Sequence, residues 1–138
     1  MRFIFLALIV ILTAVVFLSL MSQRGQAKGL VDGRLAPLSS KPNCVSSEEG
    51  TDPAKKVEPL TADKAAIKAA VEATGGKVTS ETDTYISATY TSGIMRYVDD
   101  VEFRQDGEVW QVRSASRVGY SDMGANRKRV SAIRAALP

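Results

Sequence analysis

The sequence predicts an α+β protein: a four-stranded, mostly antiparallel sheet with two helices on one face, preceded by one N-terminal transmembrane helix. Three observations support this prediction: a long apolar run at the N-terminus, alternating apolar and polar residues between positions 78 and 113, and apolar residues at helical spacing on either side of that region. Helices gathered on one face of an antiparallel sheet bury the apolar sides of both kinds of element. With 138 residues, part of them in the apolar run, the chain has room for a single domain.

The N-terminal run is long enough to cross a membrane, because residues 3–21 are apolar except for Thr13 and Ser19. As a helix it would be about 28 Å long, close to the ~30 Å hydrocarbon core of a bilayer. The apolar part of a cleaved secretory signal is usually only ~7–15 residues long, so we expect residues 1–22 to be a retained signal anchor. The flanking Lys and Arg residues mildly favour a cytoplasmic domain, whereas export behind an N-terminal apolar segment is the commoner arrangement. Both orientations stay open, and we prefer the second.

The segment after the anchor is predicted to be a flexible tether over residues 23–39, since glycine and proline recur there without an apolar period. The folded domain is expected over residues 40–138. Its first helix should begin with Thr61 as the N-cap and end at Gly75. The buried stripe of that helix comprises Ile67, Ala70, Val71 and Thr74.

Two strands are predicted next, at 78–81 and 84–91, followed by a hairpin. The dipeptide Asp106-Gly107 favours a two-residue type I′ turn, which sets the register of the hairpin. One face of the hairpin would be aromatic and aliphatic, and the other would be charged. The predicted cross-strand pairs are Phe103 with Trp110, Val101 with Val112, and Asp100 with Arg113.

A second helix is predicted at the C-terminus, capped by Ser121 or Asp122. Asn126 lies on its apolar stripe, so this amide should be buried and must find hydrogen-bond partners. The apolar members of the stripe are Val130, Ile133 and Leu137.

The composition excludes several kinds of chemistry. The chain has no histidine, which removes Ser-His and Cys-His catalysis and the common His-containing zinc sites. Cys44 is the only cysteine, so no intrachain disulfide forms, and it is either a small buried residue or a reactive thiol. The net charge of +3 is too small to indicate nucleic-acid binding. We expect no cofactor and no metal, since Asp99 points away from the face that Asp100 and Glu102 share.

The most informative stretch is the basic connection over residues 113–129. From residue 113 onward, six Lys or Arg residues stand against one acid, Asp122. One interpretation is an anion site, because helix N-termini and guanidinium groups both bind phosphate or carboxylate. The residues expected to form that site are Arg113, Arg117, Ser121, Gly124, Asn126 and Arg127.

The other interpretation is an internal network that fastens the terminal helix to the sheet. Four acids roughly match the arginines one for one, so they could take up the positive charge within the fold. The residues expected in that network are Asp99, Asp100, Glu102, Asp122 and Arg129. The sequence leaves both interpretations open.

Three ordered blocks stand out in the sequence: Pro42-Asn43-Cys44-Val45-Ser46-Ser47, then Asp99-Asp100-Val101-Glu102-Phe103, then residues 113–122 with Gly124, Asn126, Arg127 and Arg129. Together they resemble the domain of unknown function 1499 family over about residues 40–137. The resemblance implies a protein type found in bacteria and plants, often behind a signal or membrane segment, and it implies no established activity.

These observations predict a membrane-tethered binding or accessory domain without enzymatic activity, in a bacterial inner membrane with the domain in the periplasm. Its expected partners are the membrane, through the N-terminal helix, and an anionic small molecule or a protein. One alternative is an enzyme or redox factor that uses Cys44 or the acids Asp99, Asp100 and Glu102. A further alternative is an arginine network that serves only the fold.

Overall fold

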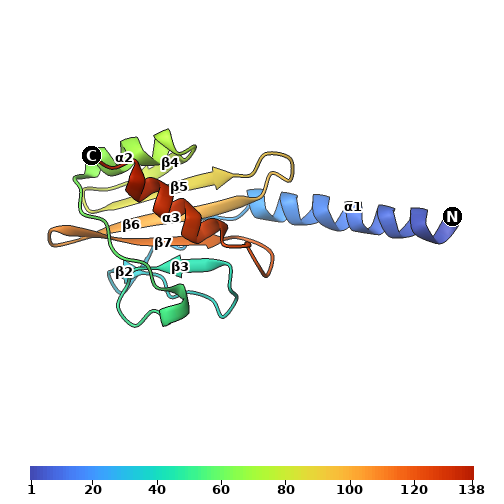
Figure 1. Ribbon diagram of the computed structural model, residues 1–138, viewed down its shortest axis with the longest axis horizontal. Coiled ribbons are helices and arrows are strands. Elements are labelled where there is room, and N and C mark those ends of the chain that lie inside the picture. Colours follow the sequence, from blue (N-terminus) through green and yellow to red (C-terminus); the bar gives the residue numbers. More distant parts are fainter.

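The computed structural model describes residues 1–138 as a helix that projects from one end of an α+β domain (Figure 1). Helix α1, Arg2–Gln23, is long and apolar enough to cross a membrane. Most of its side chains are exposed, and its contacts with the domain are made near its C-terminal end, against β6.

The main sheet is antiparallel throughout and has the strand order β3-β7-β6-β5-β4. The predicted α+β class and antiparallel pairing are confirmed, but the predicted number of four strands is wrong. The additional strand, β3, has only three residues, all buried, so it shows no alternation that a sequence pattern could reveal. The strands are β3 Cys44–Ser46, β4 Lys77–Glu81, β5 Tyr85–Thr91, β6 Val98–Asp106 and β7 Val109–Ser116.

Helices α2 (Lys64–Ala73) and α3 (Ala125–Ala135) cover one face of this sheet, as predicted (Figure 1). The N-cap of α2 is Asp63 rather than Thr61, since the Asp63 carboxylate accepts a hydrogen bond from the Ala66 N–H at 2.7 Å. A short 3₁₀ helix, η1 (Pro53–Lys55), precedes α2. The core between the helices and the sheet includes Leu60, Ile67, Val71, Ile86, Phe103, Trp110, Val112, Val130 and Ile133.

The β6–β7 hairpin turns at Gly107-Glu108, not at Asp106-Gly107, because Asp106 pairs with Val109. Gly107 has a φ of 63°, as the first central residue of a type II′ turn requires. The predicted register is therefore wrong by two residues: Phe103 lies opposite Val112, and Glu102 lies opposite Arg113. Because side chains alternate with a period of two, this even shift leaves every residue on its predicted face.

Residues 23–39, expected to be a flexible tether, follow a defined path over the polar face of the sheet, the face without α2 and α3. They contain β1 (Leu30–Val31) and β2 (Arg34–Leu35), which pair antiparallel. Leu35 and Ala36 are buried. The polar side chains that hold this segment, described next, explain why it lies against the sheet.

Candidate functional site

A buried ion pair lies at the centre of the polar face. The Glu102 carboxylate is fully buried and accepts hydrogen bonds from Arg113 Nη1 at 3.2 Å, the Tyr85 hydroxyl at 2.7 Å and the Gly29 N–H at 2.7 Å. Arg113 Nε donates to the Ala36 carbonyl at 2.9 Å. Burial, together with the hydrogen bond to Glu102, raises the pKa of Tyr85 well above its usual value, so Tyr85 remains a donor. The pair thus binds residues of the N-terminal segment to the sheet.

A second ion pair joins the sheet to the end of α1. Arg117 Nε and Nη2 contact the two oxygens of Asp100, each at 2.7 Å, and Arg117 Nη1 donates to the Ser22 carbonyl at 3.0 Å. The buried Ser22 hydroxyl accepts from the Val98 N–H at 2.7 Å and donates to the Val98 carbonyl at 3.2 Å. A side chain at Gly25 would collide with Arg117, because an added Cβ would lie 2.7 Å from Arg117 Cδ. The apolar helix is therefore fixed to the domain rather than linked to it flexibly.

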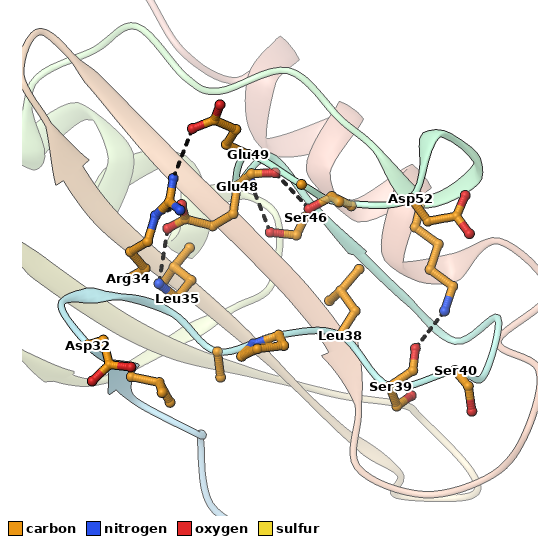
Figure 2. Close-up of a pocket in the computed structure, with 16 residues that line it drawn as sticks. Asp32, Arg34, Leu35, Leu38, Ser39, Ser40, Ser46, Glu48, Glu49 and Asp52 are labelled. Carbon is orange, nitrogen blue, oxygen red and sulfur yellow. Dashed lines mark hydrogen bonds and ion pairs between the residues drawn. The ribbon is translucent and has the colours of Figure 1, made fainter.

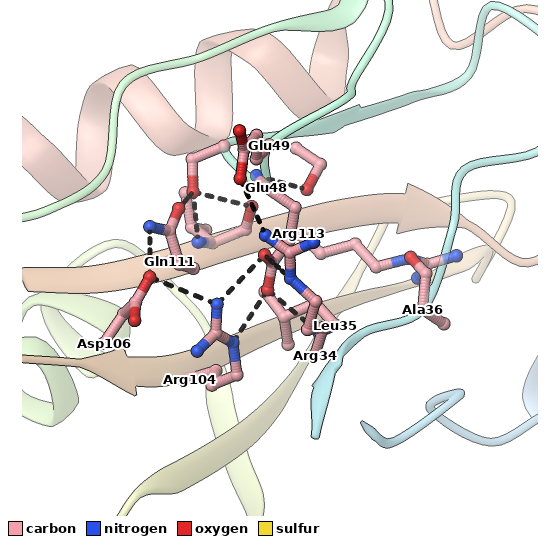
Figure 3. Close-up of polar contacts among 12 residues, drawn as sticks. Arg34, Leu35, Ala36, Glu48, Glu49, Arg104, Asp106, Gln111 and Arg113 are labelled. Atoms are coloured by element: carbon pink, nitrogen blue, oxygen red, sulfur yellow. Dashed lines mark hydrogen bonds and ion pairs between the residues drawn. The ribbon is translucent and has the colours of Figure 1, made fainter. Parts of the chain in front are cut away.

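A third pair, Glu48 with Arg104, was not predicted from the sequence (Figure 3). Arg104 Nε and Nη2 donate to the two Glu48 oxygens at 2.8 and 3.0 Å, and the Leu35 N–H donates to Glu48 at 3.0 Å. Burial raises the pKa of Glu48, but the hydrogen bonds from Arg104 and Leu35 and the charges of Arg104 and Arg34 outweigh it, so the pKa lies below its usual value. Nothing in the local sequence marks Glu48, since its partners lie far along the chain.

The helix face of the sheet holds a separate network around Asn126. This fully buried amide donates to the Asn43 carbonyl at 3.0 Å and accepts from the Ser114 hydroxyl at 2.6 Å. Asp122 accepts from the backbone N–H groups of Gly124 at 2.8 Å and Asn126 at 2.9 Å, where α3 begins. Burial raises the pKa of Asp122, but the hydrogen bonds from Asn126 and Gly124 lower it below its usual value. A carboxylate of the chain itself thus occupies the N-terminus of α3.

The sheet separates the residues that were expected to form one anion site. Arg113 and Arg117 lie on the polar face and contact acids there, whereas Asn126 lies under α3 on the other face. Arg127 is exposed and donates to the carbonyls of Lys56 at 2.9 Å and Ala54 at 2.8 Å, and Ser121 accepts from the Met123 N–H. Arg129 contacts Asp99 at 2.8 Å and lies over the Tyr90 ring. Every buried side-chain polar atom has a hydrogen-bond partner.

Cys44 lies in β3 and is buried. Its sulfur is 3.4 Å from the Lys41 carbonyl and 3.8 Å from the Ser39 carbonyl. Residues 39–41 therefore lie against the thiol, and a reagent could reach it only after that segment moved.

A groove of about 770 Å³ lies beside the polar face (Figure 2). Segments 31–40 and 46–55 line it. Its surface combines apolar Leu35 and Leu38 with serine hydroxyls and carboxylates. A smaller hollow of about 290 Å³ lies between α3 and the segment before α2, lined among others by Lys56, Arg127 and Arg134. The sequence pattern did not indicate either cavity.

Comparison with known families identifies the chain. A model described as "Protein of unknown function (DUF1499)" matches residues 34–137. The chain belongs to this family. No curated protein and no solved structure matches the DUF1499 chain. The match begins at Arg34, so the DUF1499 domain includes β2 and the residues that pack Leu35 and Ala36 onto the polar face.

Proposed function

We propose that this DUF1499 protein is a membrane-anchored accessory domain that binds a partner without catalysing a reaction. In this proposal α1 crosses a bacterial inner membrane once, the domain lies on the periplasmic side, and the groove of Figure 2 receives a segment of a partner protein. The observation that carries the proposal is the contrast between two sets of charged groups. The buried acids and arginines are paired with each other, whereas the groove has two carboxylates at its rim, Asp32 and Asp52, that make no ion pair.

The chemistry of the groove favours a partner segment with positive charge. Asp32 and Asp52 are exposed at the rim and make no ion pair within the chain. The ammonium group of Lys55, which also lines the groove, donates a hydrogen bond to the Ser39 carbonyl at 2.6 Å. Leu35 and Leu38 supply an apolar floor for a side chain between the charged groups. Interfaces of this kind combine a buried apolar centre with a polar rim.

A specific observation also favours a second candidate, an anion site. The smaller hollow has three cations in its wall, Lys56, Arg127 and Arg134, against one acid, Glu58. None of the three cations makes an ion pair in the fold, and guanidinium groups bind phosphate and carboxylate well. Of the residues first expected to bind an anion, only Arg127 belongs to this hollow.

Thermal unfolding of the full chain in nanodiscs tests both candidates. The probes are inorganic phosphate, citrate, phosphoglycerol, Mg²⁺, Ca²⁺ and a lysine-rich peptide. A ligand at about 100 times its dissociation constant stabilises the folded state by roughly 2.7 kcal/mol, a shift of several degrees. We expect the peptide to stabilise the native chain and to have no effect on the Asp32→Asn, Asp52→Asn double variant.

Two other results would change the assignment. Stabilisation by phosphate or citrate that disappears in Arg127→Ala would establish the anion site instead. If none of the probes raised the melting temperature, both candidates would be contradicted, and the arginine network would be a purely structural feature. Fusion of a periplasm-dependent reporter enzyme to the C-terminus tests the proposed orientation separately.

A further inference from the structure

The most exposed apolar side chains of the domain lie on two loops. Outside α1, the large apolar side chains with the highest exposure are Ile94 at 97%, Met123 at 89% and Tyr120 at 70%. Ile94 lies in the loop between β5 and β6 (92–97), and the other two lie in the loop between β7 and α3 (117–124). Exposed apolar groups gathered in one region of a domain indicate a contact surface.

Both loops adjoin the place where α1 joins the sheet. Val98 follows the first loop directly and exchanges two hydrogen bonds with Ser22. Arg117 starts the second loop, and its N–H donates to the Val98 carbonyl while its guanidinium reaches the Ser22 carbonyl. Figure 1 shows the two loops at the end of the sheet from which α1 projects, with the β6–β7 turn at the opposite end.

Because the loops lie beside the C-terminal end of α1, they lie at the level of the surface of a bilayer that α1 crosses. The apolar run ends at Met21, so a membrane crossed by α1 would end close to Ser22. Ile94 is four residues from Val98, a distance of at most about 14 Å for an extended chain. Because Ser22 and Arg117 fix α1 to the sheet, the loops cannot turn away from that surface without breaking the junction.

We propose that the loops 92–97 and 117–124 form a second membrane contact, inserting Ile94, Tyr120 and Met123 into the interface of the bilayer that α1 crosses. This inference rests on the proposal that α1 spans a membrane. Tyrosine is enriched at the headgroup level of membranes, and long cationic side chains can keep their charge among headgroups while apolar neighbours insert. Arg96 lies in the first loop and Arg24 caps the C-terminal end of α1; both are exposed, and their charge matches that of anionic lipids. The contact would fix the orientation of the groove relative to the membrane.

Quenching by lipid tests the contact in the full chain. Cys44 is replaced by alanine, and single cysteines are placed at Val10, Ile94, Met123 and Glu108, each labelled with bimane. Each variant is reconstituted in vesicles of phosphatidylethanolamine and phosphatidylglycerol (3:1) that contain a spin-labelled lipid with its nitroxide near the headgroup or in the acyl chain. Position 10 reports on α1, and position 108 is an exposed control in the turn at the far end of the domain.

We expect the headgroup-level quencher to reduce emission at positions 94 and 123 at least threefold more than at position 108, and the acyl-chain quencher to act on position 10. Equal quenching at 94, 123 and 108, with position 10 still quenched, would overturn the loop contact and leave the anchor intact. An unquenched label at position 10 would overturn the membrane-spanning proposal, and the loop contact with it. As a second test, Ile94→Asp should reduce quenching at position 123 while the melting temperature in detergent stays unchanged, since Ile94 packs against nothing in the fold.

Discussion

Replacement of Arg113 by methionine removes the cation that faces the fully buried Glu102 carboxylate and keeps most of the apolar stem. Glu102 would retain the Gly29 N–H and the Tyr85 hydroxyl as donors but would lose its only ion pair. Removing one partner of a buried pair costs roughly 3–5 kcal/mol, because the remaining charge is left uncompensated. For a domain of this size that corresponds to a fall in melting temperature of roughly 10–20 °C.

Urea unfolding of the full chain in detergent measures this loss, followed by the fluorescence of Trp110, which is buried and is the only tryptophan. The midpoint should fall while the slope of free energy against urea stays unchanged. Arg127→Met is the matched control: this exposed arginine makes no ion pair, so its loss should cost less than about 1 kcal/mol. Adding Glu102→Gln to Arg113→Met should recover part of the lost stability. A loss below about 1 kcal/mol for Arg113→Met alone would refute the reasoning.

Four further predictions concern single features of the fold. Ser22→Val should cost roughly 1–3 kcal/mol in urea unfolding, since a buried backbone N–H loses its acceptor, and a neutral result would show that the junction of α1 is loose. Gly76→Ala should cost roughly 1–3 kcal/mol, because its Cβ would lie 2.6 Å from the Tyr90 ring, whereas Gly93→Ala, with open space around it, should change little. Because the pKa of Glu48 is lower in the folded chain than its ordinary value of 4.5, ionised Glu48 stabilises the fold above pH 4.5, and this contribution is lost as the pH falls through the pKa of the folded chain. Glu48→Gln should therefore make the free energy of unfolding, measured in urea, depend less on pH in the acidic range. Cys44 should react with a thiol reagent at least tenfold more slowly in the folded chain than in urea, and fast labelling of the folded chain would restore the thiol hypothesis.

The faces of the strands and helices could be read from the sequence because they depend on local periods. The alternation around Phe103 and Val112 placed both residues in the core even though the predicted register was wrong. Asn126 was correctly expected to be buried and hydrogen-bonded, since it shares a helical stripe with Val130 and Ile133. The apolar helix was equally clear from the sequence, since residues 3–21 are interrupted only by two hydroxyl-bearing residues and are long enough to cross a membrane.

The pairing of individual charges was not available from the sequence. Arg113 was expected opposite Asp100, but the actual register gives it Glu102 and leaves Asp100 for Arg117. A shift of two residues leaves the faces unchanged but replaces every cross-strand partner. Glu48 and Arg104 were missed altogether because 56 positions separate them in the chain.

Local sequence patterns were thus sufficient to predict which residues are apolar on one face of each element and where the membrane-length helix lies, and they gave an arginine–carboxylate network as one of two interpretations. The folded chain was needed to show which acid each arginine contacts, that residues 23–39 lie on the polar face, and that loops 92–97 and 117–124 lie at the end of the sheet from which α1 projects. The difference arises from the range of the interactions. Periodicity and capping act within a few residues, whereas the Ser22–Val98 and Gly29–Glu102 hydrogen bonds join positions more than seventy residues apart and form only once the sheet has fixed its register.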